Sequence, residues 1–192
     1  PFLIRINVTS YTSGNLRVVL TTDSFFQDGV AQVTSFTNDT VVNATVLTDI
    51  GAITATNAWS EGSWSDFRGW PVVSRFYQDR LCFASTASEP MTIWMTQTSN
   101  YFSFLRHSVL LDTDGITVNL PSRQLNAING LIVFKRLIAL TTGSIWSVGP
   151  PESSPLTPTT MILEVESYTG SQGINPAVIG NEAIYVQTNG KV

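Results

Sequence analysis

Short runs of β-branched and aromatic residues recur along this chain, and Gly, Asn, Asp, Ser and Pro separate them. No stretch of about ten residues places apolar side chains at the i, i+3, i+4 and i+7 positions of an amphipathic helix. Short strands bounded by turn residues are typical of β-sandwiches, barrels and propellers. The pattern therefore predicts an all-β protein.

Residues 1–58 contain several of these runs and predict a small β module, either a barrel or a sandwich. The clearest signal is a hairpin between residues 30–36 and 41–47, because the connecting residues include Asn38 and Asp39, which favour turns. The other strands expected in this module are residues 2–8, 16–21 and 53–58.

Residues 59–71 have a different character. Trp59, Trp64, Phe67 and Trp70 lie close together here, among two glycines, and this spacing does not suit a regular amphipathic strand. We expect an irregular connection, packed by its own aromatic side chains, that joins two modules.

From Val72 to the C-terminus, strand candidates return in a steady rhythm. Three or four short strands about every 40 residues are typical of propeller blades. We therefore predict β-propeller blades over residues 72–192, with a β-sandwich as the main alternative. The expected strands are residues 72–77, 80–85, 91–95, 108–111, 116–120, 126–128, 131–134, 137–142, 144–148, 161–168 and 183–187.

Composition narrows the possible functions. Charged residues make up only 12% of the chain, against about 25% in typical domains. Such a surface is common where partner subunits cover it, although a β protein rich in Thr and Ser has the same composition. The net charge of -4, without any run of Lys or Arg, argues against gripping nucleic acid through its phosphates. This charge balance does not argue against a protein that lets nucleic acid slide past its surface without binding it.

The chain begins at Pro1 without a Met, and we expect it to be a segment of a longer polypeptide. No apolar run approaches the about 18 residues that suggest a membrane helix, and no signal peptide is recognisable. The segment is therefore not expected to insert into a membrane.

Cys82 is the single cysteine and His107 the single histidine. An intrachain disulfide, a Cys/His zinc site and a two-histidine metal site are therefore excluded. A catalytic triad would have to use His107, yet no Gly-x-Ser-x-Gly motif accompanies it. We expect His107 to be a surface or interface residue.

Two acidic pairs are further candidates for chemistry. Asp112 and Asp114 have the spacing of the first two carboxylate ligands in a calcium-binding loop. The twelfth position, where such a loop needs Glu, is Arg123. A β-turn between strands is the better interpretation. Glu164 and Glu166 lie on one face of an expected strand, where they could serve glycoside hydrolysis but more often form a solvated face. We predict no enzyme activity, no cofactor, and no catalytic, cofactor-binding or metal-binding residue.

Asn7, Asn38 and Asn43 each begin an Asn-x-Thr sequon. These would be glycan sites in a secreted eukaryotic protein. Chance supplies such triplets easily in a chain rich in Asn and Thr, and the lack of disulfides disfavours that setting. We interpret the sequons as incidental.

An ordered series of short motifs runs from Gly69 to Phe104. A Gly-Trp-Pro turn leads into a strand with Gln-x-Arg-Leu-x-Phe, then come Thr-x-Ser-x-Pro-x-Thr-Ile-Trp and Tyr-x-x-Phe. The series resembles the tail nozzle family of podoviruses, also called tail tubular protein B, and weaker similarity extends the likeness to residues 59–192. Glu89 stands where we would expect Gln or another polar residue. The motif residues are Gly69, Pro71, Gln78, Arg80, Leu81, Phe83, Pro90, Ile93, Trp94, Tyr101, Phe104, Trp146 and Pro158.

These residues suit structural roles. Gly69 and Pro71 fix a turn at which no ladder hydrogen bond is needed. We expect Arg80 to pair with an acidic or backbone acceptor near the turn. Large apolar side chains are expected on the inner faces of adjacent strands, namely Phe76, Leu81, Phe83, Ile93 and Trp94.

The resemblance implies a propeller with additional β domains in a homo-hexameric ring. That ring joins the tail adaptor and tail fibre proteins, continues the channel for double-stranded DNA and holds the genome until ejection. It implies a place in the virion tail, after assembly in the bacterial cytoplasm. An acidic lumen would let DNA pass with low friction. Two alternatives remain, a carbohydrate-binding or -cleaving propeller in host recognition and a secreted glycosylated receptor domain.

Overall fold

The computed structural model describes residues 15–22, 25–38, 41–50, 59–107, 109–152, 154–180 and 182–192. Strands account for 47% of the protein and are organised in several antiparallel sheets, without a helix among the described residues. The predicted all-β class is confirmed. The chain divides into two compact units, Pro1–Trp70 and Pro71–Val192, and each is described by itself.

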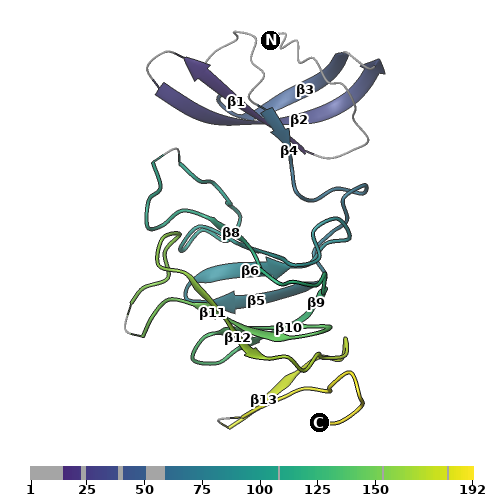
Figure 1. The fold of residues 1–192 in the computed structure, drawn as a ribbon. Helices are drawn as coiled ribbons and strands as arrows, with labels where there is room; N and C mark the ends of the chain where they lie inside the picture. Colours follow the sequence, from purple (N-terminus) through teal and green to yellow (C-terminus); the bar gives the residue numbers. More distant parts are fainter. Residues whose placement is uncertain are drawn as a thin grey trace. The chain divides into compact units, whose positions relative to one another are not determined.

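The first unit contains one four-stranded sheet in the order β3-β2-β1-β4 (Figure 1). The predicted hairpin between residues 30–36 and 41–47 is confirmed, since β2 and β3 pair antiparallel. The strands expected at residues 2–8 and 53–58 lie outside the described residues. The bounds are β1 Asn15–Thr22, β2 Phe25–Asn38, β3 Val41–Thr48 and β4 Trp59–Glu61.

The segment expected to be an irregular connection begins as strand β4, which pairs with β1. Its remainder is irregular, but the expected packing of its aromatic side chains on one another is wrong for Phe67 and Trp70, which are 68% and 60% exposed. Polar contacts hold the turn instead. The Gly69 amide donates to the Ser65 carbonyl at 2.7 Å, and the Trp70 indole donates to Asp66 at 3.1 Å.

The second unit is built from two successive four-stranded antiparallel meanders and a terminal hairpin, in which each strand pairs with its neighbours in sequence (Figure 1). The first meander comprises β5 Val73–Tyr77, β6 Arg80–Ala84, β7 Thr92–Met95 and β8 Ile116–Asn119. The second comprises β9 Ile128–Val133, β10 Leu137–Thr141, β11 Ile145–Gly149 and β12 Ile162–Ser167. The hairpin is β13 Ala177–Ile179 and β14 Glu182–Ile184.

Three local expectations for this unit need correction. Residues 126–128 and 131–134 were expected as two strands, but β9 runs through Gly130, where a Cβ would approach the Leu140 side chain to 3.2 Å. The glycine permits close packing inside a strand rather than ending it. Residues 109–111 are a loop, not a strand, and β13 was not anticipated.

The main core lies between the two meanders. Cys82, Ala84, Ile93 and Met95 of the first sheet are fully buried, as are Leu131, Leu137, Ala139 and Val148 of the second. Burying a Leu, Ile, Val or Met side chain contributes about 1.5–3 kcal/mol, so this interface accounts for much of the unit's stability.

The expected set of inward-facing residues is only partly correct. Ile93 is in the core, but successive strand residues point to opposite faces, so its neighbour Trp94 lies on the outer face of the first sheet, where it is nonetheless 4% exposed. Phe76 is 61% exposed. Leu81 and Phe83 alternate with buried Cys82 and share the outer face with Trp94.

Candidate functional site: the β5–β6 turn and the loops it holds

The motif residues Gln78 and Arg80 meet at the tight turn between β5 and β6. Gln78 and Asp79 have φ values of 44° and 57°, as the central residues of a type I′ turn do. A left-handed conformation costs a residue other than Gly about 1–2 kcal/mol. The contacts of these side chains offset that cost.

Arg80 is completely buried and forms the centre of the site. Its guanidinium donates to four backbone carbonyls, those of Thr96 at 2.7 Å, Asp112 at 2.8 Å, Asp114, and Leu156 at 3.5 Å. The expectation that Arg80 pairs with an acceptor near the turn is confirmed, and the acceptors are backbone groups. Burial lowers the pKa of this guanidinium, whereas the nearby Asp114 and Asp79 carboxylates oppose the change.

The neighbouring side chains bind other loops. The Gln78 side-chain oxygen accepts from the Leu156 amide at 3.0 Å. The Asp79 carboxylate accepts from the Ser99 hydroxyl and from the Tyr101 hydroxyl, the latter at 2.7 Å. These two hydrogen bonds hold the pKa of Asp79 below its ordinary value. The turn thus ties together the loops around residues 96–103, 112–114 and 155–160.

Aromatic residues of the last motif cover the outer face of the first sheet. The Tyr101 ring packs edge-on against Phe76 with centroids 5.2 Å apart, and Phe104 lies 6.0 Å from Phe83. Tyr101 therefore links the outer face to Asp79 in the turn. This geometry explains the Tyr-x-x-Phe spacing in terms of packing.

Asp114 fixes the long loop before β8. Its buried carboxylate accepts from the backbone amides of His107 and Leu111 at 2.9 and 3.0 Å, and its other oxygen lies 2.6 Å from His107 Nδ1. The bond to Leu111 uses an amide that a strand at residues 108–111 would place in a ladder, and residues 109–111 are accordingly a loop. Burial raises the pKa of Asp114, but the hydrogen bonds from His107 and Leu111 outweigh burial and leave it lowered.

The candidate calcium loop and the candidate catalytic histidine both have structural surroundings. Residues 112–114 form a turn, but it connects a loop to β8 rather than two strands. His107 is exposed, as expected, and is occupied with Asp114. Within the described ranges, no group of three or more His, Cys, Asp or Glu residues could hold a metal ion.

Asp114→Asn should destabilise the second unit by about 1–3 kcal/mol at pH 7, because charged acceptors form the stronger hydrogen bonds. The folded-state pKa of Asp114 lies below its unfolded value, so its contribution is complete above the unfolded pKa of about 3.9. It disappears as the pH falls through the folded pKa. Urea unfolding at pH 7 and at progressively lower pH should show the difference between the two proteins shrinking in acid, and a constant difference would contradict this role.

The other motif residues lie apart from the turn and have structural contacts of their own. Trp146 is in the main core and donates to the Ser144 hydroxyl at 2.8 Å. The Pro90 carbonyl accepts from the Ile128 amide at 2.9 Å, and Pro158 sits in a turn closed by Thr157 and Thr160. Gly69 has a φ of 89°. The motif alone did not reveal the roles of Asp79 and Asp114, although a carboxylate within a tight turn is a signal for such contacts.

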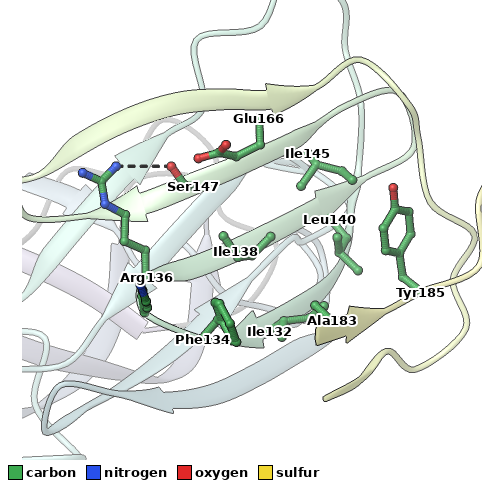
Figure 2. A pocket seen from close by; sticks show the side chains of 11 residues that line it. Ile132, Phe134, Arg136, Ile138, Leu140, Ile145, Ser147, Glu166, Ala183 and Tyr185 are labelled. Carbon is green, nitrogen blue, oxygen red and sulfur yellow. Dashed lines mark hydrogen bonds between the residues drawn. The ribbon is translucent and has the colours of Figure 1, made fainter. Parts of the chain in front are cut away.

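A groove of about 350 Å³ lies on the outer face of the second meander, away from the main core (Figure 2). Ile132, Leu140 and Ile145 form its buried floor, against which Ile138 and Tyr185 pack. Lys135, Arg136 and Glu166 also line it. We call it the β9–β12 groove.

The two glutamates weighed as a catalytic pair have different surroundings. Glu164 forms an ion pair with Arg136, which also donates to Ser147 at 3.4 Å. Of the two, only Glu166 lines the groove among the residues described there. Both are exposed on the same face of β12, which agrees with the solvated face that we expected.

The described residues define an all-β protein of several antiparallel sheets, in which the motif residues Gln78, Arg80 and Tyr101 meet at one turn. A scan of the chain against models of protein families and a search of curated proteins both found no match. The described part of the chain also contains no helix long and apolar enough to cross a membrane. The sequence motifs and the geometry around Arg80 therefore provide the basis for a functional proposal.

Proposed function

We propose that this chain is a structural virion protein, a tail nozzle subunit of a short-tailed bacteriophage. In this role it forms a homo-hexameric ring that continues the DNA channel, retains the genome and opens for ejection. The observation that carries the proposal is the convergence of Gln78, Arg80 and Tyr101 on one turn. Residues of the ordered motif series thus have interlocking structural roles, as befits a scaffold rather than an enzyme.

The architecture supports β-propeller blades over residues 72–192. The two meanders are consecutive, four-stranded and packed face to face, and their first strands β5 and β9 lie side by side. Adjacent blades of a propeller have this arrangement. The second meander has apolar residues on both faces, which suits a layer covered on both sides. For residues 1–58 we propose a small barrel or sandwich, joined by residues 59–71.

The low charge and net charge of -4 support the remaining parts of the proposal. A sparingly charged surface suits contacts with neighbouring subunits, the tail adaptor and tail fibre proteins. An acidic channel repels the phosphate backbone, so double-stranded DNA would pass without adhering. This role places the protein in the virion tail.

A second candidate is a carbohydrate-binding or -cleaving propeller in host recognition. The specific observation in its favour is the β9–β12 groove, which combines Tyr185 and Phe134 with Glu166. Aromatic side chains beside polar groups are suited to binding small ligands.

Electron microscopy of the purified full-length protein tests the first proposal, and sixfold rings with a central hole are the expected result. The same preparation on a glycan array should give no specific binding. Glycan binding by a protein that forms no rings would contradict the nozzle proposal and favour the second candidate. If glycan binding is observed, Phe134→Ala is the matched variant, because it alters the groove without touching the Arg80 turn and should remove that binding.

A further inference from the structure

The terminal hairpin of the second unit is only partly packed. β13 and β14 pair with each other and form a two-stranded sheet of their own. Every residue of β13 is exposed, with Val178 at 47% and Ile179 at 64%. A two-stranded hairpin is at best marginally stable in water unless it packs against other elements. The hairpin is therefore stabilised by any apolar surface of its own unit that it can cover.

Hydrogen bonds fix the base of this hairpin to the second meander. The Ser171 amide donates to the Thr141 carbonyl at 2.8 Å, and the Asn129 side-chain amide donates to the Ser171 carbonyl at 2.7 Å. The Gln172 amide donates to the Val186 carbonyl at 2.8 Å and so joins the two ends of the hairpin. Among the described residues, no hydrogen bond joins β13 or β14 themselves to the meander. The base is therefore held, whereas the two strands beyond it can turn about it.

The strand register decides which face of the hairpin is turned to the β9–β12 groove. Val178 is paired with Ala183, so their side chains lie on the same face. Ala183 and Tyr185 line the groove (Figure 2), and this face is therefore the one that looks into it. Ile179 and Glu182 form the next pair and point to the opposite face. Val178 nevertheless does not line the groove, so the hairpin covers the groove only in part.

The groove offers this hairpin face an apolar surface. Its floor of Ile132, Leu140 and Ile145 is buried, whereas Ile138 is half-buried and Phe134 is 38% exposed. About 350 Å³ remains open in the groove. Because the free energy of burial grows with the apolar area removed from water, packing of the hairpin onto Ile138 and Phe134 is favourable.

The charged residues of the groove do not oppose such packing. Lys135, Arg136 and Glu166 line it, and Arg136 forms an ion pair with Glu164. Lys135 and Glu166 are exposed, and long charged side chains can keep their charged ends in water while their stems cover apolar surface. The hairpin brings no further charge to the groove, because Glu182 is on its other face.

We propose that the β13–β14 hairpin is a lid, which turns about its base and closes on the β9–β12 groove by inserting Val178 beside Ile138. The second meander then has the main core on one face and its own terminal hairpin on the other. The open lid admits a small molecule to the groove, and the closed lid occupies the same space. This inference goes beyond the proposed function and does not depend on it, because the lid and the groove belong to one unit.

Cysteine cross-linking within the whole chain tests the closure. The protein with Ile138→Cys and Val178→Cys is treated with diamide, which accepts the two thiol hydrogens as an intramolecular disulfide forms. Cys82 should remain silent, because burial raises the pKa of its thiol to about 12. The matched control combines Ile138→Cys with Ile179→Cys, so both proteins share any effect of the first substitution. The control should cross-link at least about tenfold more slowly, because cysteines whose Cβ atoms point apart cannot be bridged without backbone movement.

Equal rates in the two proteins, or disulfides that form only between molecules, would overturn the lid. A second test needs no cysteine. Val178→Asp should hold the lid open and speed amide hydrogen exchange in β13 and β14 by about tenfold, whereas exchange in the core strands of the meander should not change. Ile179→Asp should have little effect, and an equal effect of both changes would show that the hairpin does not pack through its Val178 face. Sixfold rings without the disulfide would refute the lid alone, and the disulfide without rings would refute the nozzle alone.

Discussion

Replacing Arg80 with Met is expected to lower the free energy of unfolding of the second unit by about 3 kcal/mol or more. Methionine fills much of the same volume and adapts to irregular space, so the change removes the guanidinium while limiting the cavity. The four carbonyls that Arg80 binds then lose this donor in a buried place. The loops around residues 96, 112 and 156 lose their common anchor at the same time.

Urea unfolding followed by tryptophan fluorescence measures the effect. Arg75→Met is the matched control, because Arg75 is exposed on the adjacent strand and its guanidinium donates to the carbonyl of the neighbouring Ser74 at 2.9 Å. That control should change stability by no more than about 0.5 kcal/mol. Arg80→Lys should be intermediate, because a single ammonium cannot reach carbonyls that the guanidinium fork spans. Equal stability of Arg80→Met and Arg75→Met would show that the turn does not hold the loops.

The second large effect is expected for Gly170→Ala, at about 3 kcal/mol, which is the upper part of the usual range for overpacking. A Cβ on Gly170 would lie 1.8 Å from the Thr142 carbonyl oxygen and 2.5 Å from its carbon. These are backbone atoms, so the strand ends must move apart. The movement would break the bond from the Ser171 amide to the Thr141 carbonyl, which is 2.8 Å long.

Gly173→Ala is the control for this change. A Cβ there meets no atom within 4 Å, and Gly173 is not among the glycines with positive φ. Its substitution should be neutral or stabilise the protein by about 0.4–1 kcal/mol, because alanine restricts the unfolded chain. Differential scanning calorimetry of the two variants compares them directly. A melting temperature of Gly170→Ala equal to that of Gly173→Ala would contradict the close approach of the backbones.

Local patterns were most informative where strands are short and bounded by turn residues. The pairs β2–β3, β5–β6 and β10–β11 occur where alternating or β-branched runs flank short turns. The errors arose where a tertiary contact overrides the local signal. Gly130 suggested a break, yet it lies within β9 because Leu140 packs closely against it.

The strand expected before Asp112 failed for a different reason. Its run of apolar residues suggested a strand, but hydrogen bonds with residues outside the run hold this segment as a loop. The Asp114 carboxylate takes the amides of His107 and Leu111, and Arg80, remote in sequence, takes the next carbonyl. No pattern within the run itself contains that information.

The sequence by itself determined the all-β class, the positions of most strands and the exposure of His107. It also indicated that Arg80 would bind either an acidic or a backbone acceptor. These follow from the alternation of side chains, the chemistry of turn residues and the high cost of burying an unpaired guanidinium. Only the tertiary structure decided which carbonyls Arg80 binds, that Phe76 faces outward, and that an apolar loop and an apolar groove lie in different layers of one unit. The physical reason is that these features depend on contacts between residues far apart in the chain, which are settled when the sheets pack.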